Sequence, residues 1–115
     1  MSKTLIDILI EEAWEKEKYF KNYLRYARKI KKEAEKLLGK SRVFVFGSVL
    51  KKDEVPRDID VLIVSPKIKK GFPRGKTLAK IWEKIGFASP FEIHFASPSD
   101  YQNWYRFFLK GAKEI

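Results

Sequence analysis

Two carboxylates stand at the start of an apolar segment in the middle of the chain. Asp58 and Asp60 open the stretch "DIDVLIV" (58–64), and a strand places alternate residues on the same face. Two acids crowded at the margin of a core repel each other and lose hydration, so they need a compensating cation. Magnesium suits this arrangement, because it binds one or two carboxylates together with water and substrate phosphates. The spacing therefore predicts a metal site at Asp58 and Asp60.

Two flanking features extend this candidate site. Upstream, the apolar stretch "RVFVF" leads directly into Gly47 and Ser48. A glycine lets backbone N–H groups approach a ligand closely, and a serine hydroxyl can donate to a phosphate. Downstream, Glu92 alternates with Phe91 and Ile93, and it joins the aspartates if its strand lies beside theirs. We therefore expect Gly47 and Ser48 to bind phosphate and Glu92 to be a third metal ligand.

Each of these signals also has a purely structural explanation. Acids at a strand start are often solvated, a Gly-Ser pair is often a turn, and one acid in an apolar strand often marks an exposed face. His94 shares the face of Glu92; it can bind metal, move a proton or serve only a structural role. The stretch "GFPRGKT" (71–77) lacks one residue of phosphate-loop spacing between its glycines, so we interpret it as a loop before a helix.

Helices are expected at both ends of the chain. Residues 4–38 contain no Gly or Pro, and apolar residues recur every three or four positions from Phe20 until Gly39 ends the pattern. Residues 4–14 are apolar on nearly all sides, which predicts a separate helix buried against the domain or against a partner. Ser97 is expected to cap a last helix over 98–111, whose aromatic residues either pack in the core or stack on nucleic-acid bases.

The middle of the chain alternates strands with a helix. Strands are expected at "RVFVF" (42–46), "IDVLIV" (59–64) and "FEIHF" (91–95), with a helix over 76–86. This order predicts an α+β fold, a short mixed β-sheet flanked by helices with a long N-terminal helix. The 115 residues form a single domain, 1–115, with a helical segment 1–39, a motif-bearing core 41–97 and the C-terminal helix 98–111.

Composition narrows the class of partner. Lys and Arg number 25 against 15 acids, a formal charge of +10, so the surface attracts polyanions such as nucleotides or nucleic acid. The absence of cysteine excludes disulfides and thiolate metal sites. No apolar run approaches the ~18 to 20 residues of a membrane span, so no membrane contact and a cytoplasmic location are expected. Abundant Lys and Glu with few amides are typical of a thermophile protein.

The order of these motifs resembles a known family. "GS", nine residues, "DID" before an apolar strand and a later strand carrying an acid are similar to the polymerase beta-like nucleotidyltransferase superfamily. The small size, the long N-terminal helix and "PFEIHFAS" resemble the minimal nucleotidyltransferases of archaea and bacteria that are paired with HEPN-domain proteins. The motif-bearing resemblance covers about half of the chain, residues 41–97.

This resemblance implies a nucleotidyltransferase fold and a two-metal reaction. Gly47 and Ser48 would hold the phosphates of a nucleoside triphosphate, and Asp58, Asp60 and Glu92 would bind two Mg²⁺ ions as catalytic residues. AMP from ATP would then pass to a hydroxyl acceptor, and a tyrosine of a HEPN toxin would make the protein an antitoxin. Lysines in neighbouring loops are candidates to neutralise the triphosphate: Lys51, Lys52, Lys69 and Lys70.

Two departures and two alternatives accompany the resemblance. The family often has a further glycine where this chain has Lys51 and Lys52, and a serine where it has Arg57, which affects the nucleotide pocket more than the metal site. One alternative is a noncatalytic antitoxin that binds its partner through its helices and basic surface. The other is a basic nucleic-acid-binding module, whose affinity would fall steeply with salt and would not depend on the aspartates. The sequence does not decide the oligomeric state.

Overall fold

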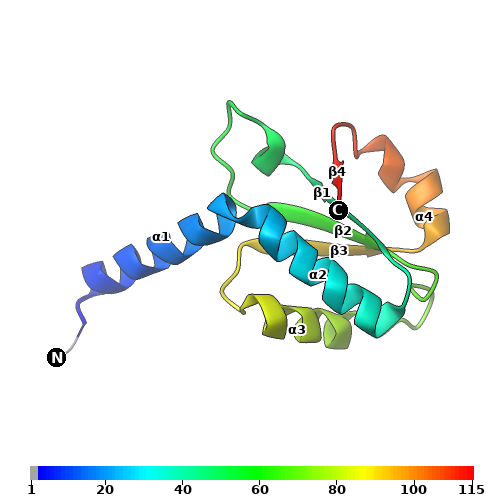
Figure 1. Ribbon diagram of the computed structural model, residues 1–115, viewed down its shortest axis with the longest axis horizontal. Coiled ribbons are helices and arrows are strands. Elements are labelled where there is room, and N and C mark those ends of the chain that lie inside the picture. The colour runs from blue at the N-terminus through cyan, green and yellow to red at the C-terminus, as the bar shows by residue number, and fades with distance from the viewer. Residues whose placement is uncertain (1–2) are drawn as a thin grey trace.

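A four-stranded sheet forms the centre of the molecule in the computed structural model, which describes residues 3–115 (Figure 1). The strand order is β3-β2-β1-β4; β1 is antiparallel to β2 and β4, whereas β2 and β3 are parallel. This mixed sheet with flanking helices confirms the predicted α+β class. The strands span Arg42–Phe46 (β1), Ile59–Val64 (β2), Phe91–Ala96 (β3) and Lys113–Glu114 (β4).

Two helices, α2 (Tyr23–Leu38) and α3 (Arg74–Ile85), cover one face of the sheet (Figure 1). Ala27, Ile30 and Ala34 of α2 are fully buried, and their spacing of three and four residues confirms the predicted helical stripe. They belong to one apolar cluster with the side chains that β1, β2 and β3 direct to this face. The main core of the protein therefore lies between the helices and the sheet.

The opposite face is covered over only part of its length. The short helix α4 (Pro98–Asn103) contributes Tyr101, whose ring stacks on Phe44 of β1 with centroids 5.1 Å apart. Leu62 and Val64 of β2 are buried in the same second cluster. At the other end of this face the side chains become polar, and that end carries the candidate site.

The C-terminal segment differs from the helix predicted over 98–111. Ser97 accepts a hydrogen bond from the Asp100 N–H, as expected of the helix start, but α4 already ends at Asn103. A 3₁₀ turn, η2 (Tyr105–Phe107), then leads back to β4, which pairs with β1. This return satisfies edge hydrogen bonds of β1 that a continued helix would leave unpaired. Only Tyr101 and Tyr105 of the aromatic run pack in the core, whereas Trp104, Phe107 and Phe108 are more than 60% exposed.

The N-terminal segment forms two helices that meet at Asn22. The first, α1 (Leu5–Lys21), begins with a capping box in which Thr4 accepts from the Asp7 N–H and Asp7 accepts from the Thr4 N–H. No residue of α1 is buried, and the helix projects from the body of the protein (Figure 1). Burial of residues 4–14 against the domain, one of the two predicted outcomes, therefore does not occur. No helix within residues 3–115 combines the length and apolar character that crossing a membrane requires.

Candidate active site

Three neighbouring strands bring the candidate site residues together at one end of the sheet. Phe46 of β1 pairs with Asp60 of β2, and Asp60 pairs with Glu92 of β3. Directly paired residues present their side chains on the same face, so these three side chains form a row across the sheet. The condition on which the Glu92 expectation depended is met, because β3 lies beside β2 and places Glu92 next to Asp60.

His94 completes a cluster of three possible metal ligands. One ligand atom from each of Asp60, Glu92 and His94 lies within 4.8 Å of the other two. The His94 Nε2 atom lies 3.5 Å from Asp60 Oδ1 and 3.7 Å from Glu92 Oε1. The side chains of Asp60 and His94 are 24% and 31% exposed, and that of Glu92 is 58% exposed. The cluster is therefore held by the sheet and remains accessible to a ligand.

Gly47 lies against this cluster at the end of β1. It adopts φ +86, a left-handed conformation that favours glycine, and opens a single 3₁₀ turn, η1 (Ser48–Leu50). A Cβ atom at this position would lie 2.5 Å from Asp60 Oδ2, which is closer than side-chain contacts allow. Glycine thus lets the backbone touch the carboxylate, and Ser48 follows at the edge of the site.

Asp58 lies outside this cluster. Strand β2 begins at Ile59, so Asp58 belongs to the preceding coil, and its side chain is exposed. Strand alternation predicts that Asp58 gathers with Asp60, but Asp58 is not among the residues whose ligand atoms lie together. Two of the three predicted metal ligands, Asp60 and Glu92, are brought together, and His94 occupies the third place.

The predicted phosphate-neutralising lysines are not gathered at this site. Lys51 pairs with Glu54 at 3.4 Å on the surface. Lys69 and Lys70 follow the far end of β2, where they line a different pocket with Ser97. Since Asp60 and Glu92 lie near the starts of the parallel strands β2 and β3, the length of the sheet separates them from these two lysines.

Phe46 and Arg74 are neighbours of the site that the sequence pattern did not indicate. The Phe46 ring lies beside His94, with centroids 5.6 Å apart, and limits the positions of the imidazole. Arg74 lines a pocket of about 290 Å³ with His94 and Tyr105 along β3. It donates to the Phe95 carbonyl at 3.3 Å, so its guanidinium lies along β3. Both contacts depend on strand register and on the path of α3, which no local motif encodes.

The comparisons with known proteins point to one family. A family model described as "Nucleotidyltransferase domain" matches residues 27–107, which include Gly47, Asp60, Glu92 and His94. The match extends from α2 to η2 and leaves the whole of α1 outside. Comparison with curated proteins and with solved structures gives no match.

Proposed function

Because the chain belongs to the nucleotidyltransferase domain family, we propose that it transfers a nucleoside monophosphate, AMP from ATP, to a hydroxyl acceptor. The observation that carries this proposal is the cluster of Asp60, Glu92 and His94 beside Gly47. It combines possible ligands for a divalent metal with a backbone position where a phosphate can come close.

The residues present fit a divalent metal ion. Two carboxylates and one imidazole are hard or borderline donors, and they come from adjacent strands that hold them in place. The cluster supplies ligands for one ion. We assign a second ion to Asp60 together with Asp58, which precedes it by two residues on an exposed coil. Water and triphosphate oxygens would complete both sites.

The chemistry is an in-line displacement at the α-phosphorus of ATP. When bound, the two ions stabilise the attacking and the leaving oxygens. The acceptor oxygen forms a bond to the α-phosphorus, the bond to the β-phosphate oxygen breaks, and pyrophosphate leaves. Glu92, the most exposed member of the cluster, accepts the proton of the acceptor hydroxyl. Gly47 and Ser48 orient the phosphates through a backbone N–H and the hydroxyl.

We further propose that the acceptor is a protein hydroxyl, a tyrosine of a HEPN toxin. The resemblance of the long N-terminal helix and of "PFEIHFAS" to the minimal nucleotidyltransferases paired with HEPN-domain proteins supports this. Transfer can be tested with ATP labelled at the α-phosphate, using tyrosine-containing peptides and transfer RNA as competing acceptors. Label on RNA alone would contradict the assignment of a protein acceptor, while nucleotidyl transfer itself would stand.

Calorimetric titration with ATP, and then with the other triphosphates, tests the nucleotide site without knowledge of the acceptor. We expect ATP binding that requires Mg²⁺ and weakens at least about tenfold in Asp60→Asn. Asp53→Asn is the matched control, because Asp53 is exposed in the loop before β2 and lies outside the cluster. If folded wild type binds no triphosphate, the noncatalytic partner-binding alternative replaces the transferase.

A further inference from the structure

The first helix presents an apolar face that stays exposed among the described residues 3–115. We define the arm as residues 5–14, the part of α1 that projects farthest from the body (Figure 1). Leu5 and Leu9 form one row along the helix, and Ile6, Ile10 and Trp14 form the next, since residues four apart lie on the same side. All five side chains are between 42% and 70% exposed. A row of this length on a helix is typical of a protein contact surface.

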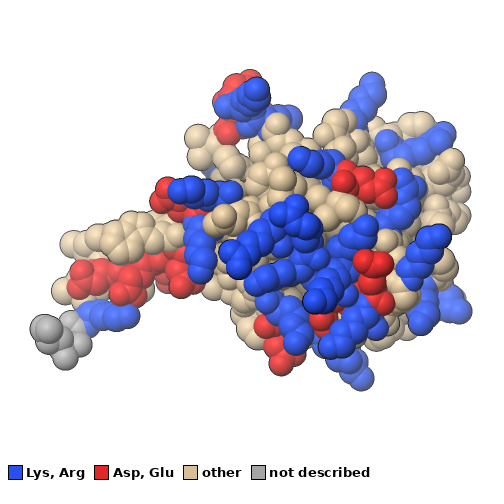
Figure 2. Space-filling model, viewed as in Figure 1, with Lys and Arg blue, Asp and Glu red and all other residues tan. Residues whose placement is uncertain are grey.

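The adjacent side of α1 is acidic. Asp7, Glu11 and Glu15 also follow one another at intervals of four and span about 12 Å along the helix. Figure 2 shows this acidic stripe next to the apolar one. Glu11 pairs with Lys3 at 2.9 Å, but both side chains are at least half exposed. Glu11 can therefore exchange Lys3 for a cation of another molecule at little cost.

The body of the protein carries the opposite charge. Residues 1–17 contain two lysines and five acids, a net charge of −3, whereas residues 18–115 contain 23 basic and ten acidic residues, a net charge of +13. Figure 2 shows that Lys and Arg gather over α2 and α3. These helices pack on one face of the sheet, whereas Asp60 lies on the opposite face with Phe46 and Leu62. A polyanion bound there would not reach Asp60, so this face is suited to docking rather than to catalysis.

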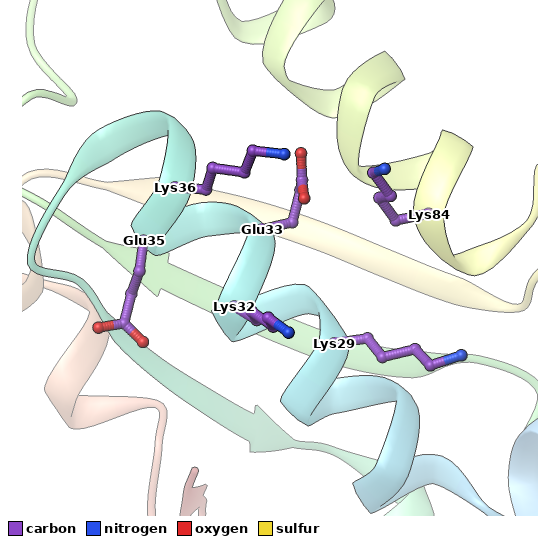
Figure 3. A pocket seen from close by; sticks show the side chains of 6 residues that line it. All are labelled: Lys29, Lys32, Glu33, Glu35, Lys36 and Lys84. Atoms are coloured by element: carbon purple, nitrogen blue, oxygen red, sulfur yellow. The ribbon is translucent and has the colours of Figure 1, made fainter.

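The lysine groove lies between α2 and α3 and is lined by Lys29, Lys32, Lys36, Lys84, Glu33 and Glu35 (Figure 3). The three lysines of α2 span about 10 Å along their helix, close to the length of the acidic row on α1. None of the four lysines forms an ion pair with another residue of the described range 3–115. Lys36 of α2 points toward Glu33 of the same helix, whereas Lys29 and Lys32 extend away from Glu33, so their amines remain open to a partner (Figure 3).

We propose that the occupant of this surface is a second copy of the chain. Two arms pack through their apolar faces, and the acidic side of each arm lies against the lysine groove of the other copy. A two-fold arrangement satisfies both contacts twice, because each chain supplies one arm and one groove. It also reduces the repulsion between two bodies that each carry +13. This inference does not depend on the proposed nucleotidyl transfer.

Sedimentation equilibrium measures the proposed pairing directly. We expect wild type to sediment at twice 13.6 kDa, and the double variant Ile6→Ser with Ile10→Ser to sediment as a monomer. Both side chains are exposed in the single chain, so the body should keep its thermal transition. Phe87→Ser is the matched control, since Phe87 is 67% exposed outside the arm and its loss should leave the dimer intact.

A charge swap tests which surfaces meet. Glu11→Lys with Glu15→Lys should weaken the dimer by about tenfold for each intermolecular ion pair removed, and Lys32→Glu with Lys36→Glu should do the same. Mixing the two variants should restore association, because each reversed arm then meets a reversed groove. Failure of the mixture to associate would overturn the assignment of the groove.

Two further results would overturn the proposal. One is a wild type that is monomeric at all concentrations, because the occupant of the arm would then be a different protein and not a second copy. The other is a monomeric chain that binds a labelled DNA duplex through the lysine groove, so that Lys32→Glu with Lys36→Glu abolishes binding. In that case the basic face serves nucleic acid, and a steep fall of affinity with salt should accompany it.

Discussion

The backbone of Gly47 touches the carboxylate of Asp60, so that a Cβ atom on Gly47 would lie 2.5 Å from Asp60 Oδ2. The two residues lie on either side of a loop in the sequence, and the antiparallel pairing of β1 with β2 brings them together. This contact couples the candidate phosphate site to the candidate metal site. A ligand bound at either residue therefore constrains the other.

Substitution of Gly47 by alanine should disrupt both sites at once. The new methyl group must displace the Asp60 carboxylate, and φ +86 is strained for alanine. We expect Mg²⁺-dependent ATP affinity to fall at least about tenfold in calorimetry, with the fold retained by circular dichroism. Gly75→Ala is the control, since a Cβ there meets nothing within 4 Å. Unchanged ATP affinity in Gly47→Ala would separate Gly47 from the nucleotide site.

The two aspartates should differ in their effect on metal binding. Asp60 belongs to the three-residue cluster and Asp58 does not, so Asp60→Asn should abolish metal binding while Asp58→Asn removes only a second ion. Titration with Mn²⁺ in the presence of a nonhydrolysable ATP analogue should give about two ions for wild type and about one for Asp58→Asn. Equal stoichiometry in wild type and Asp58→Asn would remove Asp58 from the site.

His94 should alter the choice of metal. Imidazole nitrogen suits transition-metal ions, whereas Mg²⁺ prefers an all-oxygen site. We expect His94→Ala to weaken Mn²⁺ binding on the order of tenfold and to leave Mg²⁺ binding nearly unchanged. Electron paramagnetic resonance of free Mn²⁺, with Mg²⁺ as competitor, measures both affinities. An equal loss for the two ions would indicate that His94 only positions Asp60, from which it lies 3.5 Å.

Acid should weaken the last strand. Hydrogen bonds from the Arg42 guanidinium at 2.8 and 3.0 Å lower the pKa of Glu114 from its ordinary value of 4.5. Above the pKa that Glu114 has in the unfolded chain, the ion pair contributes its full share of the stability. This contribution is lost as the pH falls through the lowered pKa that Glu114 has in the folded protein. Because both side chains are about half exposed, we expect a loss below about 1 kcal/mol. The free energy of unfolding in urea, measured at several pH values, should show this loss at acid pH in wild type and not in Glu114→Gln.

Much of the fold follows from local patterns in the sequence. The stripe of Ala27, Ile30 and Ala34, the Gly39 terminus and the Ser97 cap each depend on neighbouring residues, and the structure confirms all of them. The strand that carries Glu92 between Phe91 and Ile93 also follows from the local pattern, and the structure confirms it as β3. These features need no knowledge of distant contacts.

Other features depend on contacts that no local pattern contains. Strand β4 exists because β1 has a free edge, and this pairing overrides the helical tendency of residues 104–111. Asp58 stands outside the three-residue cluster, one residue before β2 begins at Ile59. His94 joins the site because β3 is parallel to β2 and directs it to the same face as Asp60. The sequence thus predicts the site's location better than its set of ligands.

Contacts of Tyr19 hold the inner end of α1 against the end of α3 and the neighbouring aromatic rings. The Tyr19 hydroxyl donates to the Ile85 carbonyl at 2.7 Å, at the end of α3, and burial raises the pKa of this phenol. The ring also lies 4.6 Å from Tyr26 and 6.3 Å from Phe91, measured between centroids. These contacts fix the inner end of α1 to the body while the arm projects.

Tyr19→Phe should therefore release the base of α1 without altering the sheet. The ring contacts persist, but the Ile85 carbonyl loses its donor, so we expect the free energy of unfolding to fall by about 1 kcal/mol. Tyr23→Phe is the matched control, since within residues 3–115 its hydroxyl makes no side-chain hydrogen bond. Faster amide hydrogen exchange in residues 15–22 of Tyr19→Phe would locate the change at the base of α1. Equal stability of the two variants would show that ring packing alone positions the helix.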